Sequence, residues 1–196
     1  MSTANRLLLA TTVLALLVLH PSLTVADDDS GCDEGIALRT SLVTLNNSGV
    51  TGSAKMCISA GGVHTRITAQ NLTPGNPYTV WFVYFDNPQN CLNPGHCTPA
   101  DTTTPLADPE GVLGRYDSTI AAGSQGTFSG HVGLIPSSGS EIHLPIFAHG
   151  SLSPDGHLRA RQLLTPQDPS LGAPGLGTSS DGTKGSPVAV AVFHIQ

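Results

Sequence analysis

The stretch LTPGNPYTVWFVYFDNPQNCLNPGHC, residues 72–97, decides the fold of this 196-residue chain. Its apolar part, Tyr78 to Phe85, consists almost entirely of aromatic and β-branched residues, which favour strands. Both alternating faces of this run are apolar, so we expect an interior strand that is covered on both sides, with Trp81 in the core. Proline and glycine between Pro74 and Pro77 predict a turn before the strand, and Asp86 to Pro88 begins a loop after it.

The first 26 residues have the pattern of a secretory signal peptide. Arg6 precedes an apolar run from Leu7 to Leu19, and Thr24 and Ala26 form a small-x-small cleavage site. The run is shorter than the roughly 20 apolar residues that a membrane span needs. We therefore expect cleavage after Ala26, a secreted or periplasmic protein, and no transmembrane anchor once the signal is removed.

The rest of the chain predicts an acidic flexible tail over residues 27–35 and a single domain over residues 36–196. Only 11% of the residues are charged and the net charge is −6. A nucleic-acid partner would require clustered Lys and Arg, so this composition argues against one. The acidic residues of the tail lack the spacing of a calcium-binding EF-hand loop, and a solvated tail is the better interpretation.

Four cysteines follow the predicted signal, and an even number in an exported chain predicts disulfides. Four cysteines allow three pairings. Proximity in sequence favours Cys91 with Cys97, which leaves Cys32 with Cys57. A metal or redox site at Cys91, His96 and Cys97 is the alternative, but the spacing is wider than Cys-x-x-Cys.

Short segments of strand-like character, separated by Gly- and Pro-rich turns, continue to the end of the sequence. We expect strands over residues 37–45, 53–60, 63–72, 78–85, 112–122, 127–135, 141–149, 158–164 and 187–195. No helical period follows the signal, so the fold class is all-β: an antiparallel β-sandwich of Greek-key type with about eight to nine strands. A closed β-barrel is the alternative. The last segment is apolar on both faces, which predicts insertion between two other strands.

The central stretch also carries a family resemblance. Leu72 to Pro88 with Cys91 resembles the L-x-P-G-x-x-Y-T-V-W-x-V-x-F-N-N-P motif of a group of exported bacterial proteins of uncharacterised function, and His143 to Gly150 is similar to that group's second recurring segment. This resemblance implies export and a β-sandwich fold, and no activity is attached to it.

A weaker similarity is to the copper/zinc superoxide dismutase sandwich, in which a Leu-Thr-Pro-Gly turn precedes a strand that carries copper ligands. In that register the ligand positions fall on Val80 and Phe82, which cannot bind a metal. The similarity therefore implies a related fold without the activity.

Histidine is unusually frequent. Of the eight histidines one, His20, lies in the predicted signal, which leaves seven. Imidazole is the commonest neutral metal ligand, and exported proteins meet copper and zinc. The alternation of their strands makes His64, His131 and His143 point outward, so they could form one Cu or Zn site if those strands are neighbours. Solvent-facing histidines without a metal are the alternative.

Hydrolytic chemistry has little support. Ser124 lies in a sequence that only superficially resembles G-x-S-x-G, and it is expected in a turn between strands instead of a strand-to-helix elbow. Four acidic residues lie in or near loops and could in principle supply an acid/base pair, although solvated or turn-forming roles are the simpler interpretation: Asp86, Asp101, Asp108 and Glu110. An enzymatic role is therefore left unassigned, with the balance against one.

The sequence favours an exported, disulfide-stabilised, non-catalytic binding or structural module for an unidentified extracellular ligand. Two long loops, over residues 87–110 and 165–186, are the expected ligand-binding surfaces, because loops often carry function on a rigid scaffold. No cofactor is expected. The alternative is a periplasmic or extracellular protein that binds Cu or Zn through surface histidines.

Overall fold

The computed structural model describes residues 32, 35–98, 101, 112–164 and 185–196, and its strands form two packed antiparallel sheets. The strands are β1 (Ile36–Ser41), β2 (Val43–Thr44), β3 (Thr51–Ser59), β4 (Gly62–Gln70), β5 (Pro77–Phe85), β6 (Val112–Ile120), β7 (Gln125–Val132), β8 (Glu141–Ala148) and β9 (Ser186–His194). The predicted all-β sandwich is confirmed: the described strands make two separate sheets and not a closed barrel.

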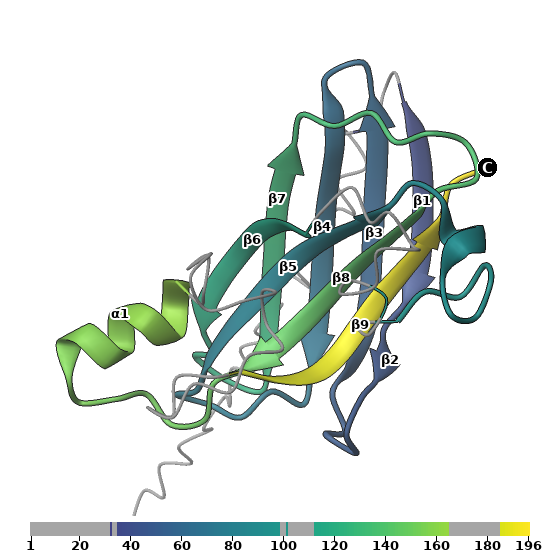
Figure 1. Cartoon of the computed structure of the whole chain (residues 1–196). Coiled ribbons are helices and arrows are strands. Elements are labelled where there is room, and N and C mark those ends of the chain that lie inside the picture. The colour runs from purple at the N-terminus through teal and green to yellow at the C-terminus, as the bar shows by residue number, and fades with distance from the viewer. Residues whose placement is uncertain (1–31, 33–34, 99–100, 102–111, 165–184) are drawn as a thin grey trace, which may run out of the picture.

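One sheet has the strand order β1-β3-β4-β7 and the other β2-β9-β8-β5-β6 (Figure 1). Only the pairs β3–β4, β5–β6 and β8–β9 are neighbours both in the chain and in a sheet. The remaining connections cross from one sheet to the other, including the turn between β6 and β7. The chain therefore weaves between the two layers.

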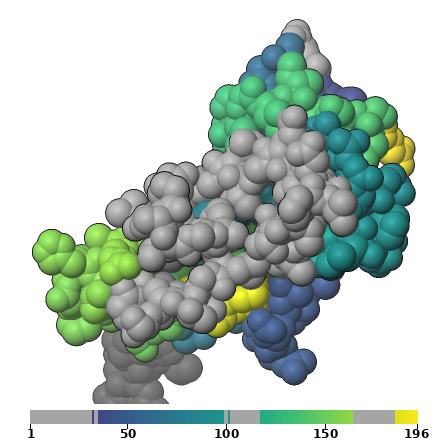
Figure 2. All heavy atoms as spheres, in the orientation of Figure 1, coloured from purple at the N-terminus to yellow at the C-terminus, as the bar shows by residue number. Residues whose placement is uncertain are grey.

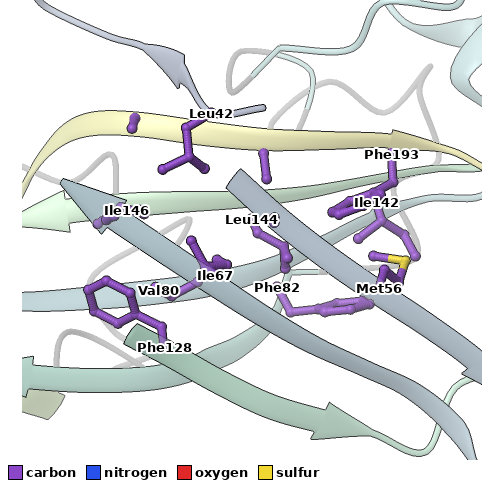
Figure 3. Close-up of a cluster of buried hydrophobic side chains, with 14 of the residues drawn as sticks. Leu42, Met56, Ile67, Val80, Phe82, Phe128, Ile142, Leu144, Ile146 and Phe193 are labelled. Carbon is purple, nitrogen blue, oxygen red and sulfur yellow. The ribbon is translucent and has the colours of Figure 1, made fainter. Parts of the chain in front are cut away.

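The main hydrophobic core lies between the sheets (Figure 3). The four-stranded sheet contributes the inward positions of β3, β4 and β7, of which Met56, Ile67 and Phe128 are almost fully buried. The five-stranded sheet contributes Phe82 and Leu144 among others. On β4 the predicted alternation is confirmed from residue 63 onward, because the odd-numbered positions from 63 to 69 are buried and the even-numbered positions from 64 to 70 are exposed.

Strand β5 is buried along its whole length, as its two apolar faces predict. Trp81 is 2% exposed, but it lies on the face of β5 that points away from the main core. There its ring meets Phe147 edge-on, with centroids 6.4 Å apart, and its Nε1–H donates a hydrogen bond to Oγ1 of Thr79. The outer face of β5 is therefore buried as well as its inner face.

Strand β9 pairs with β8 on one side and with β2 on the other, which confirms the predicted insertion of the last strand. The register places Val190 opposite both Val43 of β2 and Pro145 of β8. The last described strand thus joins a strand from the start of the domain to the middle of the sheet.

The strand expected over residues 158–164 is wrong: Gly156–Leu164 forms the helix α1. The carboxylate of Asp155 accepts hydrogen bonds from the backbone N–H groups of His157 and Leu158, as an N-terminal capping residue does. The segment is rich in Leu, Arg, Ala and Gln, which are good helix formers. The buried Gln162 then ties the helix to the end of β8 through bonds to the carbonyl oxygens of His149 and Ser151.

Both predicted disulfides are present, Cys32–Cys57 and Cys91–Cys97. The predicted signal peptide lies outside the described residues, as does the acidic tail apart from Cys32 and Gly35. Within the part of the chain that is described, no helix has the length and apolar character to cross a membrane.

Candidate functional site

Two of the three predicted metal-site histidines come together. His64 on β4 is directly opposite His131 on β7, and their rings stack with centroids 4.1 Å apart and planes 27° from parallel. Both side chains are exposed on the outer face of the four-stranded sheet. Nε2 of His131 is hydrogen-bonded to the carbonyl oxygen of Gly61 at 2.9 Å, so Nδ1 is the nitrogen left to face a ligand.

The third predicted residue, His143, is in the other sheet. It points away from the main core, as expected, but it is buried, with 7% of its surface exposed. Its ring packs edge-on against Phe85 with centroids 5.1 Å apart, and its Nε2 is hydrogen-bonded to the carboxylate of Glu141. The structure therefore does not bring His143 to His64 and His131.

Glu141 is a site residue that the sequence interpretation missed. It opens β8 and its side chain is 1% exposed. Oε1 is hydrogen-bonded to Nε2 of His143 and accepts a bond from the backbone N–H of Cys97 at 3.2 Å. Oε2 is buried and has no hydrogen-bond partner among the described residues, although Nδ1 of His194 lies 3.5 Å away. One carboxylate oxygen is thus satisfied and the other is not.

Two more histidines, His194 and His96, lie near Glu141 and His143. His194 ends β9 opposite Glu141 in the register, and its ring meets that of His96 edge-on with centroids 6.3 Å apart. The spacing of Glu141 and His143 was a usable signal, because residues two apart on a strand share a face. The approach of His194 and His96 was not visible, since it depends on strand order and on the path of a loop.

His96 belongs to the disulfide loop, which we define as residues 86–98 between β5 and the described residue Asp101. The loop begins with the short 3-10 helix η2 (Pro88–Asn90) and is closed by Cys91–Cys97. Val83, Phe85 and both cysteines form a second small hydrophobic cluster. In Figure 2 the loop is the teal region beside the yellow C-terminal residues. This small cluster attaches the buried side of the loop, here called its underside, to β5.

Asp101 fixes the loop from its far end. Its fully buried carboxylate accepts bonds from the backbone N–H of Leu92 at 2.6 Å and from the N–H and hydroxyl of Thr98, each at 2.7 Å. Burial by itself would raise the pKa of Asp101, but the hydrogen bonds from Leu92 and Thr98 outweigh it and lower that pKa below its ordinary value of 3.8. Asp101 is therefore held as a carboxylate with a structural role.

The upper surface of the disulfide loop is solvent-exposed and uncharged. No Asp, Glu, Lys or Arg occurs between residues 87 and 98. Leu92 is 68% exposed, and the other exposed side chains are mostly amides: Asn87, Gln89, Asn90, Asn93, Pro94, His96 and Thr98. A rigid base thus carries a neutral surface rich in hydrogen-bonding groups.

The remaining catalytic leads have ordinary structural positions. Ser124 is exposed in the connection between β6 and β7, where its carbonyl oxygen accepts a bond from Leu72. Asp86 accepts a bond from the hydroxyl of Tyr84 at 2.8 Å. Asp108 and Glu110 lie outside the described residues, as do the acidic residues of the tail.

Comparisons with known proteins add no assignment. No family model, no curated protein and no solved structure matches this chain.

Proposed function

We propose that this protein is an exported, non-catalytic binding module and that the disulfide loop is its ligand-binding surface. The observation that carries the proposal is the contrast between the two sides of this loop. Its underside is fixed by the Cys91–Cys97 disulfide and by the buried carboxylates of Asp101 and Glu141, while Leu92 and several amides face solvent. A loop that is already ordered loses little conformational entropy on binding.

The chemistry of the exposed side chains indicates an uncharged partner. Each Asn or Gln amide offers two donors and an acceptor, which suits hydroxyl or amide groups on a ligand. Leu92 supplies an apolar contact at the centre of the loop. The absence of charge between residues 87 and 98 gives no electrostatic attraction for phosphates or polyanions.

Export is part of the proposal. The signal-like pattern of residues 1–26 supports it, as do the two disulfides, which form and persist in oxidising compartments. The resemblance of Leu72 to Pro88 to exported bacterial β-sandwich proteins agrees with the same compartment.

The test is binding of residues 27–196, with both disulfides formed, to an array of neutral glycans and secreted proteins from the native medium. A double variant, Leu92→Ser with Asn93→Ala, removes an apolar and an amide contact from the loop. The matched control is Gln70→Ala, which changes an exposed amide on the other sheet. Loss of binding only in the loop variant supports the proposal, and a ligand retained by that variant assigns binding elsewhere.

A second candidate function is binding of copper or zinc at His64 and His131. The stacking of their rings at 4.1 Å supports it, because two imidazoles on adjacent strands are a common start for a surface metal site. Calorimetric titration with Cu²⁺ and Zn²⁺ tests it, with His64→Ala as the variant and His157→Ala, an exposed histidine on α1, as the control. Equal heats from all three proteins would exclude the pair.

A further inference from the structure

One carboxylate and three histidines gather on the outer face of the five-stranded sheet, and the proposed function gives them no role as metal ligands. Glu141 and His143 come from β8, His194 from the end of β9, and His96 from the disulfide loop. Figure 1 shows the teal loop with η2 lying beside the C-terminal end of the chain, where β9 ends. Segments far apart in the sequence therefore converge on Glu141.

The distance between Oε2 of Glu141 and Nδ1 of His194 is compatible with a metal ion bound between them. Nδ1 of His194 lies 3.5 Å from Oε2 of Glu141, whereas a charge-assisted N–H···O bond is about 2.7–2.9 Å long. Two ligands bound to one tetrahedral zinc, at about 2.1 Å each, are roughly 3.3–3.5 Å apart. The two atoms thus have the spacing of two zinc ligands, which is longer than a charge-assisted hydrogen bond although still within ion-pair distance.

The Glu141 carboxylate is also oriented as a metal-binding carboxylate is, with one oxygen held by the protein and the other left for a metal ion. Oε1 is held by Nε2 of His143 and by the N–H of Cys97, which fixes the orientation of the group. Oε2 is buried and lacks a hydrogen-bond partner among the described residues. A buried carboxylate oxygen without a hydrogen bond is costly, and a cation between Oε2 and His194 would satisfy it. Outer contacts that orient a ligating carboxylate are a regular part of metal sites.

His194 and His96 give both access and a third ligand. The His194 side chain is 58% exposed, so an ion can reach its imidazole from solvent. His96 is exposed as well, and its ring is 6.3 Å from that of His194. No three His, Cys, Asp or Glu side chains in the described residues are already arranged to hold a metal ion. A rotation of the exposed His96 side chain is therefore required to complete the set.

From this geometry we infer that Glu141, His194 and His96 form a zinc-binding site, in which His143 is a positioning residue. Two imidazoles and one carboxylate are an established zinc ligand set, with water in the fourth position. The site shares His96 with the disulfide loop but does not include Leu92 or Asn93, and it is separate from the His64–His131 pair, which lies on the other sheet.

The experiment is calorimetric titration of Zn²⁺ into residues 27–196 carrying His64→Ala and His131→Ala, so that the other histidine pair cannot contribute. One Zn²⁺ per chain is expected in this background. Adding His194→Ala or His96→Ala should weaken the affinity at least about 100-fold, and His143→Gln about 10- to 100-fold. Adding His157→Ala should change nothing.

His194 and His96 are exposed, so their variants test the site even where Glu141→Gln fails to fold. A second readout is the NMR spectrum of the imidazole groups, in which Zn²⁺ should shift the signals of His96 and His194 and leave that of His157 in place. No heat in the double-alanine background overturns the inference. Zinc affinity that is unchanged by both His194→Ala and His96→Ala overturns it equally.

Discussion

The backbone N–H of Leu92 donates a 2.6 Å hydrogen bond to Oδ1 of Asp101, and this bond spans the closed part of the disulfide loop. The same carboxylate binds Thr98 through its other oxygen, so one side chain connects the tip and the end of the loop. The shape of the exposed surface therefore depends on a residue that is itself fully buried.

Replacing this carboxylate should release the loop without unfolding the domain. Asp101→Asn removes the charge and replaces one of the two accepting oxygens by an NH₂ group, and bonds to charged groups contribute about 1.5–3 kcal/mol each. Hydrogen exchange at the amides of Leu92 and Thr98 should accelerate accordingly. Asp155→Asn is the control, because it makes the same replacement at the exposed capping residue of α1, where the Asn carbonyl oxygen can still accept the bonds from His157 and Leu158, and it should leave the amides of Leu92 and Thr98 unchanged. Unchanged exchange at Leu92 would contradict the role given to Asp101.

The loop should also open in acid. The pKa of Asp101 is lower in the closed loop than its ordinary value of 3.8, so the open loop takes up the proton at a higher pH than the closed loop does. The stabilisation is complete above 3.8 and is lost as the pH falls through the lowered pKa. Hydrogen exchange at the amides of Leu92 and Thr98, measured at decreasing pH and corrected for intrinsic exchange rates, should show this loss in the wild type. Asp101→Asn should lack it, and a profile shared by the two proteins would show that another group is responsible.

The two disulfides should stabilise unequally. Cys32–Cys57 joins residues 25 apart and Cys91–Cys97 residues 6 apart. In the chain-entropy model their removal costs about 3.5 and about 2 kcal/mol. Denaturant unfolding of the two Cys→Ala double variants measures both costs. The reverse order would mean that packing of Cys91 and Cys97 against Phe85 outweighs loop closure.

The first residue of β4, Gly62, should not tolerate a side chain. This residue has φ +116°, and a Cβ there would lie 2.2 Å from the carbonyl oxygen of Val132 on β7. Gly62→Ala is therefore expected to destabilise by at least about 2 kcal/mol. Gly133→Ala is the matched control, since a Cβ at Gly133 meets nothing within 4 Å, and its effect should stay within about 0.5 kcal/mol. Thermal unfolding compares the two, and similar midpoints would count against the steric argument.

The sequence predicted those features that depend on local pattern. The double-sided apolar run of β5 required an interior position, and the short distance from Cys91 to Cys97 favoured their pairing. Alternation also assigned His64 and His131 correctly to an outer face. The same rule could not assign a sheet, so His143 was grouped with residues from which the whole sandwich separates it.

Features that depend on tertiary contacts were less predictable. The segment of α1 is short and mixed in polarity, so its period was ambiguous, and its helix is fixed by contacts of Asp155 and Gln162. The approach of His194 to Glu141 follows from the pairing of β9 with β8. Burial of Glu141 was not expected, because a carboxylate at the start of a strand is normally solvated.

The position of β9 has a consequence for how the protein is assembled. Strand β9 follows the other described strands along the chain. It is the hydrogen-bonding partner of β2, and it pairs with one of the two edges of β8. During synthesis β2 and one edge of β8 therefore stay unpaired until β9 has emerged. Completion of the five-stranded sheet should accordingly be a late, slow and cooperative step of folding, in which β2 and β9 become ordered together.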